Sequence, residues 1–532
     1  MEALNKQALR ILKLFGHEEV SRVVPSIGCE QEYFLIDQKL YEKRKDLQFA
    51  GRTLFGAKPP KGQELDDHYF GAIKTRVKAY MEELDQELWK LGILAKTEHN
   101  EVAPAQHELA PVYTTTNIAA DHNQLTMEMM KKVAQRHGLV CLLHEKPFAG
   151  VNGSGKHNNW SVTTNTGSNL LDPTDEPNQN TLFLLFLFAV IQAVDEHQDL
   201  LRISVASAAN DHRLGANEAP PAIGSMYLGD ELMAVLDAIE NDKAYEKMDS
   251  GLLRYAHVLP RLAKDSTDRN RTSPFAFTGN KFEFRMLGAA QSVSDPNTVL
   301  NTIVAEALCD FADQLEQADN LEEAVHALLQ KTLREHKRII FNGDGYAASW
   351  QEEAARRGLL NLRSTPEALE RLTDEKNIAL FQKHRIFTKT EIQSRYEIKM
   401  EGYCKVISIE AQTMLELARK EILPAVSAYV KALSETVVAK QAACPQASCE
   451  VEQTLIVRLS ALNTSLFHKA NTLDEALLGA KNFEQIGACA AYYHDTIFAA
   501  MQELRAVADE LELNTAQQYW PFPTYGDLLF SI

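Results

Sequence analysis

The spacing of apolar and polar residues divides the chain into two halves of different character. From about residue 20 to residue 310, short apolar runs alternate with helical patterns and with Gly, Pro and Asn. Three of these runs predict β-strands, over residues 28–36, 157–164 and 281–287. An amphipathic stretch predicts a helix over residues 69–92. The first half is therefore expected to mix strands and helices.

The second half carries a helical pattern almost throughout. Apolar residues recur at spacings of three and four over residues 321–340, 407–439, 450–470 and 483–513. Loop signals lie at residues 342–350, and a Pro-containing stretch near 441–449 indicates a connection between helices. We therefore divide the chain into a leading helix at 1–20, a mixed region of strands and helices at 21–310 and a helical region at 311–532.

The most apolar segment is too short to span a membrane. Residues 181–194 read TLFLLFLFAVIQAV and are followed at once by the polar sequence DEHQD. A membrane span needs about 20 apolar residues, so a buried core helix is the better interpretation. The amphipathic N-terminus lacks a continuous apolar core and a small-residue cleavage site, and we do not interpret it as a signal peptide.

The net charge and the cysteines indicate which partners and which cellular compartment to expect. The formal net charge of −18 argues against a nucleic-acid or anionic-membrane partner, because both select basic surfaces. The seven cysteines are scattered and form no CxxC pair. An odd, scattered set is typical of a reducing compartment, so we expect a cytoplasmic protein.

Two pairs of glutamates are candidates for binding cations. Glu30 and Glu32 are two residues apart in a predicted strand, so both point to one face and repel each other unless a positive charge lies between them. Glu101 and Glu108 lie among Val, Ala, Pro and Leu, where carboxylates are rarely left unpaired. Taken alone, each pair is more simply explained by a solvated sheet edge or a surface loop.

A glycine-rich segment almost matches the P-loop pattern GxxxxGK[ST]. Gly150, Gly155 and Lys156 fit, but His157 follows where the pattern needs a Ser or Thr to bind Mg²⁺. The next residues, NNWSVTTN, predict a strand, whereas a P-loop opens a helix. We therefore reject a P-loop and expect the glycines to let the backbone approach a small ligand. A lone histidine such as His157 is more often structural than functional.

Arginines accompany these carboxylates. Arg213 and Glu218 lie in a segment rich in Gly, Asn and Pro, which is the composition of a mobile flap and also of an ordinary surface loop. Glu283 and Arg285 alternate on one strand face, as a simple salt bridge would. Four basic residues form a cluster suited to phosphate and carboxylate oxygens: Arg269, Arg271, Lys281 and Arg285.

Together these residues predict a site for divalent cations and a nucleotide. Five glutamates and one histidine are the candidate ligands: Glu30, Glu32, Glu101, Glu108, Glu283 and His157. An oxygen-rich set with one imidazole suits Mg²⁺ or Mn²⁺ better than a structural zinc. Two cations, arginines and a glycine-lined pocket are typical of phosphoryl transfer from a nucleotide such as ATP.

The motifs, in this order, resemble those of glutamine synthetases. The sequences that carry the resemblance are GCEQEYFLID, KTEHNEVAPAQHELAPVY, VNGSGKHNNW, NDHRLGANEAPPAI and GNKFEFRMLG. The helical second half and its PFPTYGDLLF ending resemble the type III branch. The resemblance implies an α+β fold, with a curved, largely antiparallel sheet flanked by helices and a helical C-terminal extension. It also implies that ATP phosphorylates the side chain of glutamate, that ammonia then displaces phosphate, and that the subunits form a large homo-oligomer of stacked rings.

The resemblance assigns roles residue by residue. One metal would be held by Glu32, Glu101 and Glu108, and a second, bridging the ATP phosphates, by Glu30, His157 and Glu283. Glutamate would be contacted by Asn152, Gly153, Arg213 and Arg285. The catalytic groups would be Glu218, which accepts a proton from ammonia, Arg285 at the reacting group and Arg271 at the phosphates. Lys281 and Asn159 would lie near the nucleotide together with Arg271.

The sequence also departs from the family pattern. Asn159 stands where the commoner bacterial enzymes carry a second histidine, and Ala276 stands where they carry an arginine. The first metal motif begins at residue 28, which leaves no room for the N-terminal β-grasp domain whose aspartate deprotonates ammonium in relatives. Three possibilities follow: a shortened but active ligase, a truncated non-catalytic relative that binds nucleotide or glutamate or assembles with full-length subunits, and a ligase for another amine.

Overall fold

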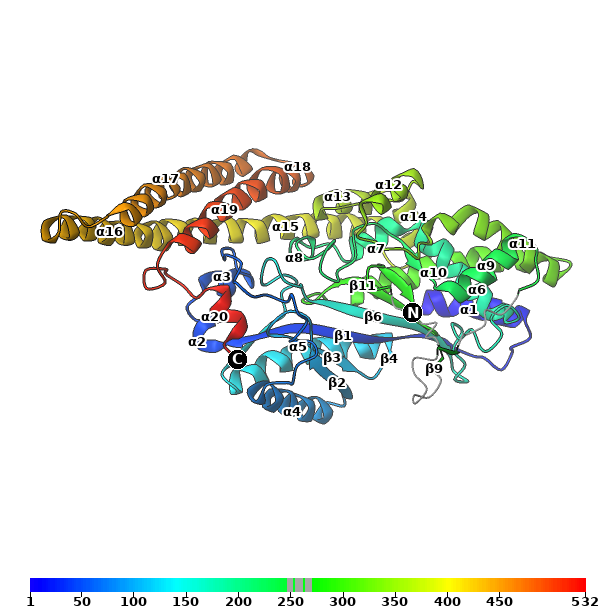
Figure 1. Ribbon diagram of the computed structural model, residues 1–532. Helices are drawn as coiled ribbons and strands as arrows, with labels where there is room; N and C mark the ends of the chain where they lie inside the picture. The colour runs from blue at the N-terminus through cyan, green and yellow to red at the C-terminus, as the bar shows by residue number, and fades with distance from the viewer. Residues whose placement is uncertain (246–251, 254–261, 264–269) are drawn as a thin grey trace.

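A nine-stranded sheet forms the centre of the computed structural model, which describes residues 1–245, 252–253, 262–263 and 270–532 (Figure 1). The strands lie in the order β2-β3-β1-β6-β11-β10-β7, and β4 and β5 also pair with β1. Their bounds are β1 Val23–Asp37, β2 Ala95–Asn100, β3 Gln106–Pro111, β4 Thr114–Thr115, β5 Leu139–Leu142, β6 Gly155–Thr164, β7 Met226–Tyr227, β10 Phe275–Phe277 and β11 Phe282–Gly288. Among the described pairs of this sheet only β7 and β10 run parallel, which confirms the predicted, largely antiparallel α+β fold.

Helices cover the sheet on both sides. They are α1 Glu2–Leu14, α2 Gln38–Tyr41, α3 Lys45–Ala50, α4 Thr75–Lys90, α5 Thr116–Arg136, α6 Thr181–Glu196, α7 Gln198–Ser204, α8 Ala208–Asp211, α9 Asp230–Glu240 and α10 Ser294–Leu315. Helices α4 and α5 share a core cluster with Tyr33 and Leu35 of β1. Helices α1, α6 and α10 pack in the main core with Trp160 of β6. Because it is apolar on every side, α6 is almost wholly buried, as predicted for residues 181–194.

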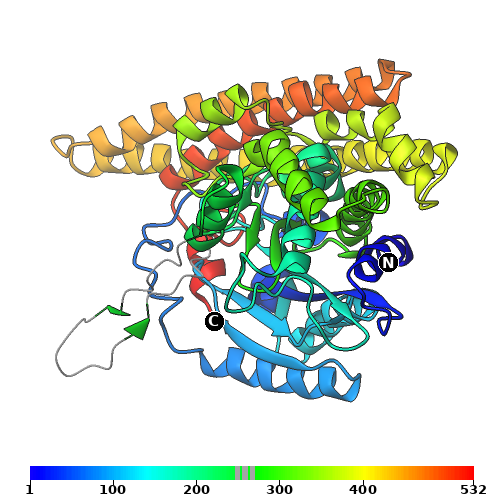
Figure 2. The ribbon, with the colours of Figure 1, turned by 90° about the vertical axis from the view of Figure 1, so that its right-hand side faces the viewer.

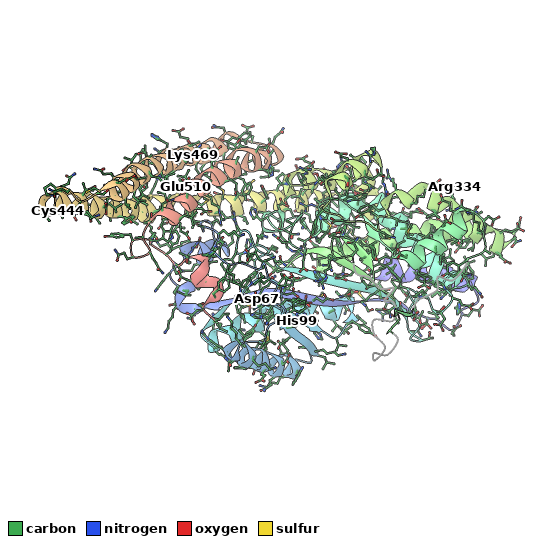
Figure 3. All side chains as sticks on the ribbon, viewed as in Figure 1. Asp67, His99, Arg334, Cys444, Lys469 and Glu510 are labelled. Atoms are coloured by element: carbon green, nitrogen blue, oxygen red, sulfur yellow. The ribbon has the colours of Figure 1, made fainter. Side chains whose placement is uncertain are left out.

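The rest of the chain is helical. Its elements are α11 Leu321–His336, η1 Lys337–Ile339, α12 Ala348–Arg356, α13 Thr365–Glu370, η2 Arg371–Thr373, α14 Glu375–Lys383, α15 Lys389–Leu417, η3 Ala418–Ile422, α16 Leu423–Ala443, α17 Glu450–Gly479, η4 Ala480–Asn482, α18 Ile486–Tyr492, η5 Tyr493–Phe498, α19 Ala499–Asn514 and α20 Tyr525–Phe530. The α16–α17 hairpin projects beyond the sheet, and Figure 2 shows the long helices lying along one side of the sheet region. Cys444 marks the tip of this hairpin (Figure 3). A small two-stranded sheet, β8 Leu252–Leu253 and β9 Leu262–Ala263, completes the described elements.

The long helix at Lys389–Ala443 differs from an ordinary core helix. It spans 55 residues, and its most apolar window of 18 residues is only 11% buried. By length and composition alone it could cross a membrane, and the bent pair α6–α7 passes the same test although it is mostly buried. Two such helices are weak evidence, because core helices of globular proteins satisfy these criteria.

Several predicted bounds were wrong. The helix expected at 69–92 begins only at Thr75, and the residues before it are irregular. The helix expected at 407–439 begins 18 residues earlier, at Lys389, and the loop expected at 342–350 ends where α12 begins at Ala348. The division of the chain near residues 20 and 310 stays a prediction; helix α1 ends at Leu14, and residue 310 lies within α10. The connection near 441–449 joins α16 to α17 as predicted.

The C-terminal segment returns to the catalytic region. Helix α20 contacts β1 and α2, and the chain ends beside them (Figure 1). Tyr525, Leu528 and Leu529 share a core cluster with Phe148 and with Ala103, which lies between two of the candidate metal ligands. The C-terminal segment therefore packs directly against two loops that carry candidate site residues.

Candidate active site

Strand register brings the candidate metal ligands together. Three pairings place them side by side: Glu30 opposite His157, Glu32 opposite Glu108, and Glu283 opposite Asn159. These strands are adjacent in the sheet, and alternate residues of a strand point to the same face. Carboxylates of β3, β1 and β11 therefore line one face of the sheet, together with His157 and Asn159 of β6.

His157 lies at the centre of one group. Its Nδ1 is 3.0 Å from Glu30 Oε2 and 3.3 Å from Glu283 Oε1, and its Nε2 is 3.7 Å from Glu32 Oε1. The amide of Asn159 donates to the other oxygen of Glu30 at 2.8 Å. The predicted second set of ligands, Glu30, His157 and Glu283, thus converges in space.

A second group contains a ligand candidate that the sequence did not suggest. His99 Nε2 is 3.1 Å from Glu108 Oε1, and His99 Nδ1 is 3.7 Å from Glu101 Oε1. Donor atoms of these three residues lie within 4.8 Å of one another, as do those of Glu30, Glu108 and His157. Glu108 is therefore within reach of both groups, whereas the sequence assigned it to one. Glu32 accepts a hydrogen bond from the Gly155 backbone at 2.6 Å. This bond directs the Glu32 side chain toward the glycine-rich segment at residues 150–155, which we call the glycine loop.

Burial and the charges of neighbouring carboxylates favour the protonated forms of Glu101 and Glu108. Burial, with the charges of Glu32 and Glu108, raises the pKa of Glu101 to about 8. Burial also raises the pKa of Glu108, with Glu30 and Glu32 contributing to the shift. Five glutamates crowd this face with side chains at most 22% exposed. Such a set is stabilised by added positive charge, so the donors fit divalent cations with oxygen ligands.

The pKa values of the two imidazoles, His157 and His99, are also raised, which favours their charged forms. Burial and Arg285 oppose the charged form of His157, but the hydrogen bond to Glu30 and the charge of Glu32 help to raise its pKa to about 9. The hydrogen bond to Glu108 is the main cause that raises the pKa of His99 to about 9. Both histidines supply local positive charge among the glutamates.

The glycine loop makes room for an arginine. A side chain at Gly155 would overlap the Arg213 guanidinium, and one at Gly153 would overlap the Glu145 carbonyl. Arg213 is 2% exposed, and its guanidinium donates to the Leu287 and Arg285 carbonyls at 3.3 Å. The glycines therefore allow a close approach, as predicted, but the group that approaches Gly155 is a side chain of the protein. The residues after Lys156 form β6, which supports the rejection of a P-loop.

Glu218 lies in a strained turn. Both Asn217 and Glu218 have positive φ angles, of 54° and 66°, which are unfavourable for residues other than glycine. Glu218 accepts from Arg271 at 2.8 Å and from the Asn152 side chain at 3.2 Å. These contacts connect the predicted flap with the glycine loop that carries Asn152 and with a predicted phosphate-binding arginine.

The remaining basic residues are placed differently. Arg285 donates to Glu283 at 2.6 Å, and its buried Nε has no hydrogen-bond partner within the described part of the chain. Lys281 precedes β11 on the β10–β11 turn, and the described contacts do not connect its side chain with the other candidates. Arg269 lies outside the described residues.

A segment that the sequence analysis overlooked also lines the site. Residues 57–74 run between α3 and α4 without regular structure, and we call them the strap. In the strap, Gln63 bonds to Asn152, and His68 Nδ1 lies 2.7 Å from the Glu101 carbonyl. Figure 3 labels Asp67 of the strap and His99 of β2. No periodicity marks this segment, because its contacts are with residues far away in the sequence.

Comparison with known proteins agrees with this geometry. Residues 6–222 match the family described as glutamine synthetase, catalytic domain, and residues 324–441 match the glutamine synthetase C-terminal domain. A glutamine synthetase of Butyrivibrio fibrisolvens is 51% identical over 100% of this chain and 76% of its own length. A type-3 glutamine synthetase of Dictyostelium discoideum is 46% identical, with 100% and 73% covered, and a glutamine synthetase of Bacteroides fragilis is 42% identical, with 100% and 74% covered. The chain therefore belongs to the glutamine synthetase family, as a glutamate–ammonia ligase of the type III kind.

Proposed function

We propose that the carboxylate-lined face of the sheet is the centre at which this ligase joins ammonia to glutamate. The observation that carries the proposal is the convergence of Glu30, Glu283 and His157, with Glu108 within reach. The family uses ATP and divalent metals, and its substrates are glutamate, ammonia and ATP. Clusters of buried acids with raised pKa values are typical of functional sites.

The residues are proposed to hold two ions, Mg²⁺ or Mn²⁺. We assign Glu32, Glu101 and Glu108 to one and Glu30, His157 and Glu283 to the other. Carboxylate oxygens and one imidazole are ligands that both ions accept. When bound, such cations supply positive charge that neutralises phosphate oxygens during phosphoryl transfer.

Arginines are proposed to bind the anionic groups of the substrates. Arg213 is assigned to a glutamate carboxylate, beside Asn152 and Gly153, and its burial fixes the direction of its guanidinium. Arg285 is assigned to the reacting group, and its unpartnered buried Nε supports this role. A buried donor without a partner costs about 1–3 kcal/mol, which a bound anion recovers.

The nucleotide end is assigned to three residues: Arg271, Lys281 and Asn159. Arg271 currently bonds to Glu218, so phosphate and Glu218 compete for its guanidinium. Glu218 is proposed to close over the glutamyl phosphate and to accept a proton from ammonia. Excluding water at this step protects the acyl phosphate from hydrolysis.

The protein is further proposed to act in the cytoplasm as a large homo-oligomer of stacked rings. All seven cysteines are free, which suits a reducing compartment. Helix α16 has one buried residue, Val426, and we assign the exposed faces of α16 and α17 to contacts between subunits. The mass in solution, measured by light scattering, tests the oligomer.

The activity is tested by ADP release from the purified chain with glutamate, ammonium and Mg²⁺. Glu283→Ala should lower the rate on the order of 100-fold or more, because it removes a charge from the reacting centre. Glu322→Ala, at an exposed position of α11, is the matched control and should leave the rate unchanged. Titration with Mn²⁺, followed by electron paramagnetic resonance, should find two tight sites in the wild type and one in Glu283→Ala.

One outcome favours the non-catalytic alternative. If wild type and Glu283→Ala release ADP equally slowly while both still bind ATP, this chain is not a ligase on its own. Two Mn²⁺ sites in both proteins would instead show that Glu283 is not a ligand.

A further inference from the structure

Gln63 of the strap makes two hydrogen bonds to Asn152. Gln63 Oε1 accepts from the Asn152 backbone N–H at 2.8 Å, and Gln63 Nε2 donates to Asn152 Oδ1 at 2.7 Å. One carboxamide thus holds both the backbone and the side chain of the same residue. Asn152 is 3% exposed and Gln63 is half-buried, so one partner of this pairing is shielded from solvent.

The donor and the acceptor are fixed in each hydrogen bond of the series from Gln63 through Asn152 to Glu218. The Asn152 backbone N–H can only donate, so the atom of Gln63 that faces it must be the oxygen. The nitrogen of Gln63 then faces Asn152 Oδ1, which makes Oδ1 an acceptor. The Asn152 NH₂ group is left to face Glu218 Oε2, at 3.2 Å, where a carboxylate can only accept. Gln63 therefore decides which end of the Asn152 amide points toward the flap.

We propose that Gln63 is a positioning residue for glutamate binding, acting by holding the Asn152 amide with its NH₂ group toward the substrate and Glu218. This inference rests on the proposed function, in which Asn152 contacts glutamate. Without Gln63, only the 3.2 Å bond to Glu218 favours this orientation of the amide, and the loop must be ordered when glutamate binds. Holding the productive orientation in advance removes that cost from binding.

The strap is anchored independently of Gln63. His68 Nδ1 lies 2.7 Å from the Glu101 carbonyl, and the Asn100 side chain donates to the His68 carbonyl at 3.1 Å. Lys61 forms an ion pair with Asp67 within the strap. Substituting Gln63 should therefore leave the strap in place and change only its hold on Asn152.

Two substitutions separate the roles of the two Gln63 atoms. Gln63→Ala removes both bonds, and Gln63→Glu keeps the acceptor for the backbone N–H but places an oxygen against Asn152 Oδ1. The carboxylate of Gln63→Glu should turn the Asn152 amide over and direct its oxygen at Glu218. We expect the KM for glutamate to rise about 3- to 10-fold in Gln63→Ala and at least as much in Gln63→Glu. The KM for ATP should stay within about twofold.

Three controls make the result decisive. Leu65→Ala alters a 74% exposed side chain of the same strap and should leave both KM values unchanged. In an Asn152→Ala background, Gln63→Glu should cause no further rise in the KM for glutamate, because the group it turns is absent. Unchanged thermal midpoints show that the variants fold.

Other outcomes contradict the inference. An unaltered KM for glutamate in Gln63→Glu, an equal rise for ATP, or a full additional effect in the Asn152→Ala background would each overturn it. The wild-type assay distinguishes this failure from failure of the proposed function. If the wild type shows no glutamate-dependent ADP release, the proposed function fails, whereas an active wild type with unaffected Gln63 variants refutes only the positioning role.

Discussion

Replacing Tyr525 by Phe should loosen the loop that carries Asn152 and Gly153, the residues proposed to contact glutamate. The Tyr525 hydroxyl lies 2.6 Å from Thr53 Oγ1, and it accepts from the Ala149 backbone at 3.0 Å and from Arg505 at 2.9 Å. The side chain is 1% exposed, and Gly56 has no side chain that would overlap its ring. Phenylalanine keeps the edge contact with the Phe148 ring, whose centroid is 5.4 Å away, and removes only the hydroxyl.

Of the groups that contact the Tyr525 hydroxyl, the Ala149 backbone N–H should be affected most by its removal. Thr53 keeps its bond to the Pro147 carbonyl, and Arg505 keeps those to Asp509 and to the Thr53 carbonyl. The Ala149 N–H has no second acceptor among the described contacts. An amide that loses its partner costs about 1–3 kcal/mol, and because the Ala149 side of the loop is exposed, water reduces this to about 1–2 kcal/mol. At 1.4 kcal/mol per factor of ten, this amide should exchange hydrogen roughly 5- to 30-fold faster.

Hydrogen exchange followed by mass spectrometry of a peptide covering residues 147–153 measures this change. Tyr429→Phe is the control, because Tyr429 is half-buried on α16 and its hydroxyl makes no hydrogen bond within the described part of the chain. We expect Tyr525→Phe to accelerate exchange in that peptide and to raise the KM for glutamate, with Tyr429→Phe unchanged in both. Exchange at the wild-type rate in Tyr525→Phe would refute the claim that the C-terminal segment holds this loop.

Two further predictions concern buried carboxylates. Burial, with a contribution from Asp85, raises the pKa of Glu98 to about 9, above its value in the unfolded chain. The free energy of unfolding should therefore fall as the pH rises from about 5 to about 9, by up to about 1.4 kcal/mol per pH unit. Glu98→Gln should flatten this decline in thermal midpoint, and an unaltered slope would contradict the assignment. Glu410→Ala should cost about 3–5 kcal/mol in chemical denaturation, because it leaves Arg52, bound at two distances of 2.7 Å, buried and unpaired. Glu401→Ala, at an exposed ion pair on the same helix, should cost less than about 1 kcal/mol.

Local patterns were sufficient to predict the central strands. The strand expected at 157–164 is β6, Gly155–Thr164, and the one expected at 281–287 is β11, Phe282–Gly288. Apolar and polar residues alternate in these strands because one face of each strand packs against the core. The early start of α15 was missed because few of its first residues are buried, so the apolar period is weak there. Its capping box, Thr388 with Glu391, was the available signal.

Site residues could be predicted from the sequence where a charged residue stands among apolar neighbours. Glu101 and Glu108 were conspicuous as acids among apolar residues, and the structure places both in a buried carboxylate cluster. Gln63 has no such signal, because a glutamine in a polar loop is ordinary. Its bond to Asn152 joins residues 89 positions apart, and the Ala149–Tyr525 bond joins residues 376 apart. Contacts of this kind depend on the tertiary fold and leave no trace in local spacing.

The helical region therefore does more than extend the molecule. Glu410 of α15 binds Arg52, Asp509 of α19 accepts from the Gly56 backbone, and Tyr525 of α20 binds Thr53. All three contacts fall on the residues that immediately precede the strap. The strap in turn bonds to Asn152 through Gln63 and to the Glu101 carbonyl through His68. The helices therefore hold the chain next to the segment that contacts both residues. A catalytic region without this support would keep its carboxylates, which the sheet register places, but would lose the anchor of the segment that bonds to Asn152.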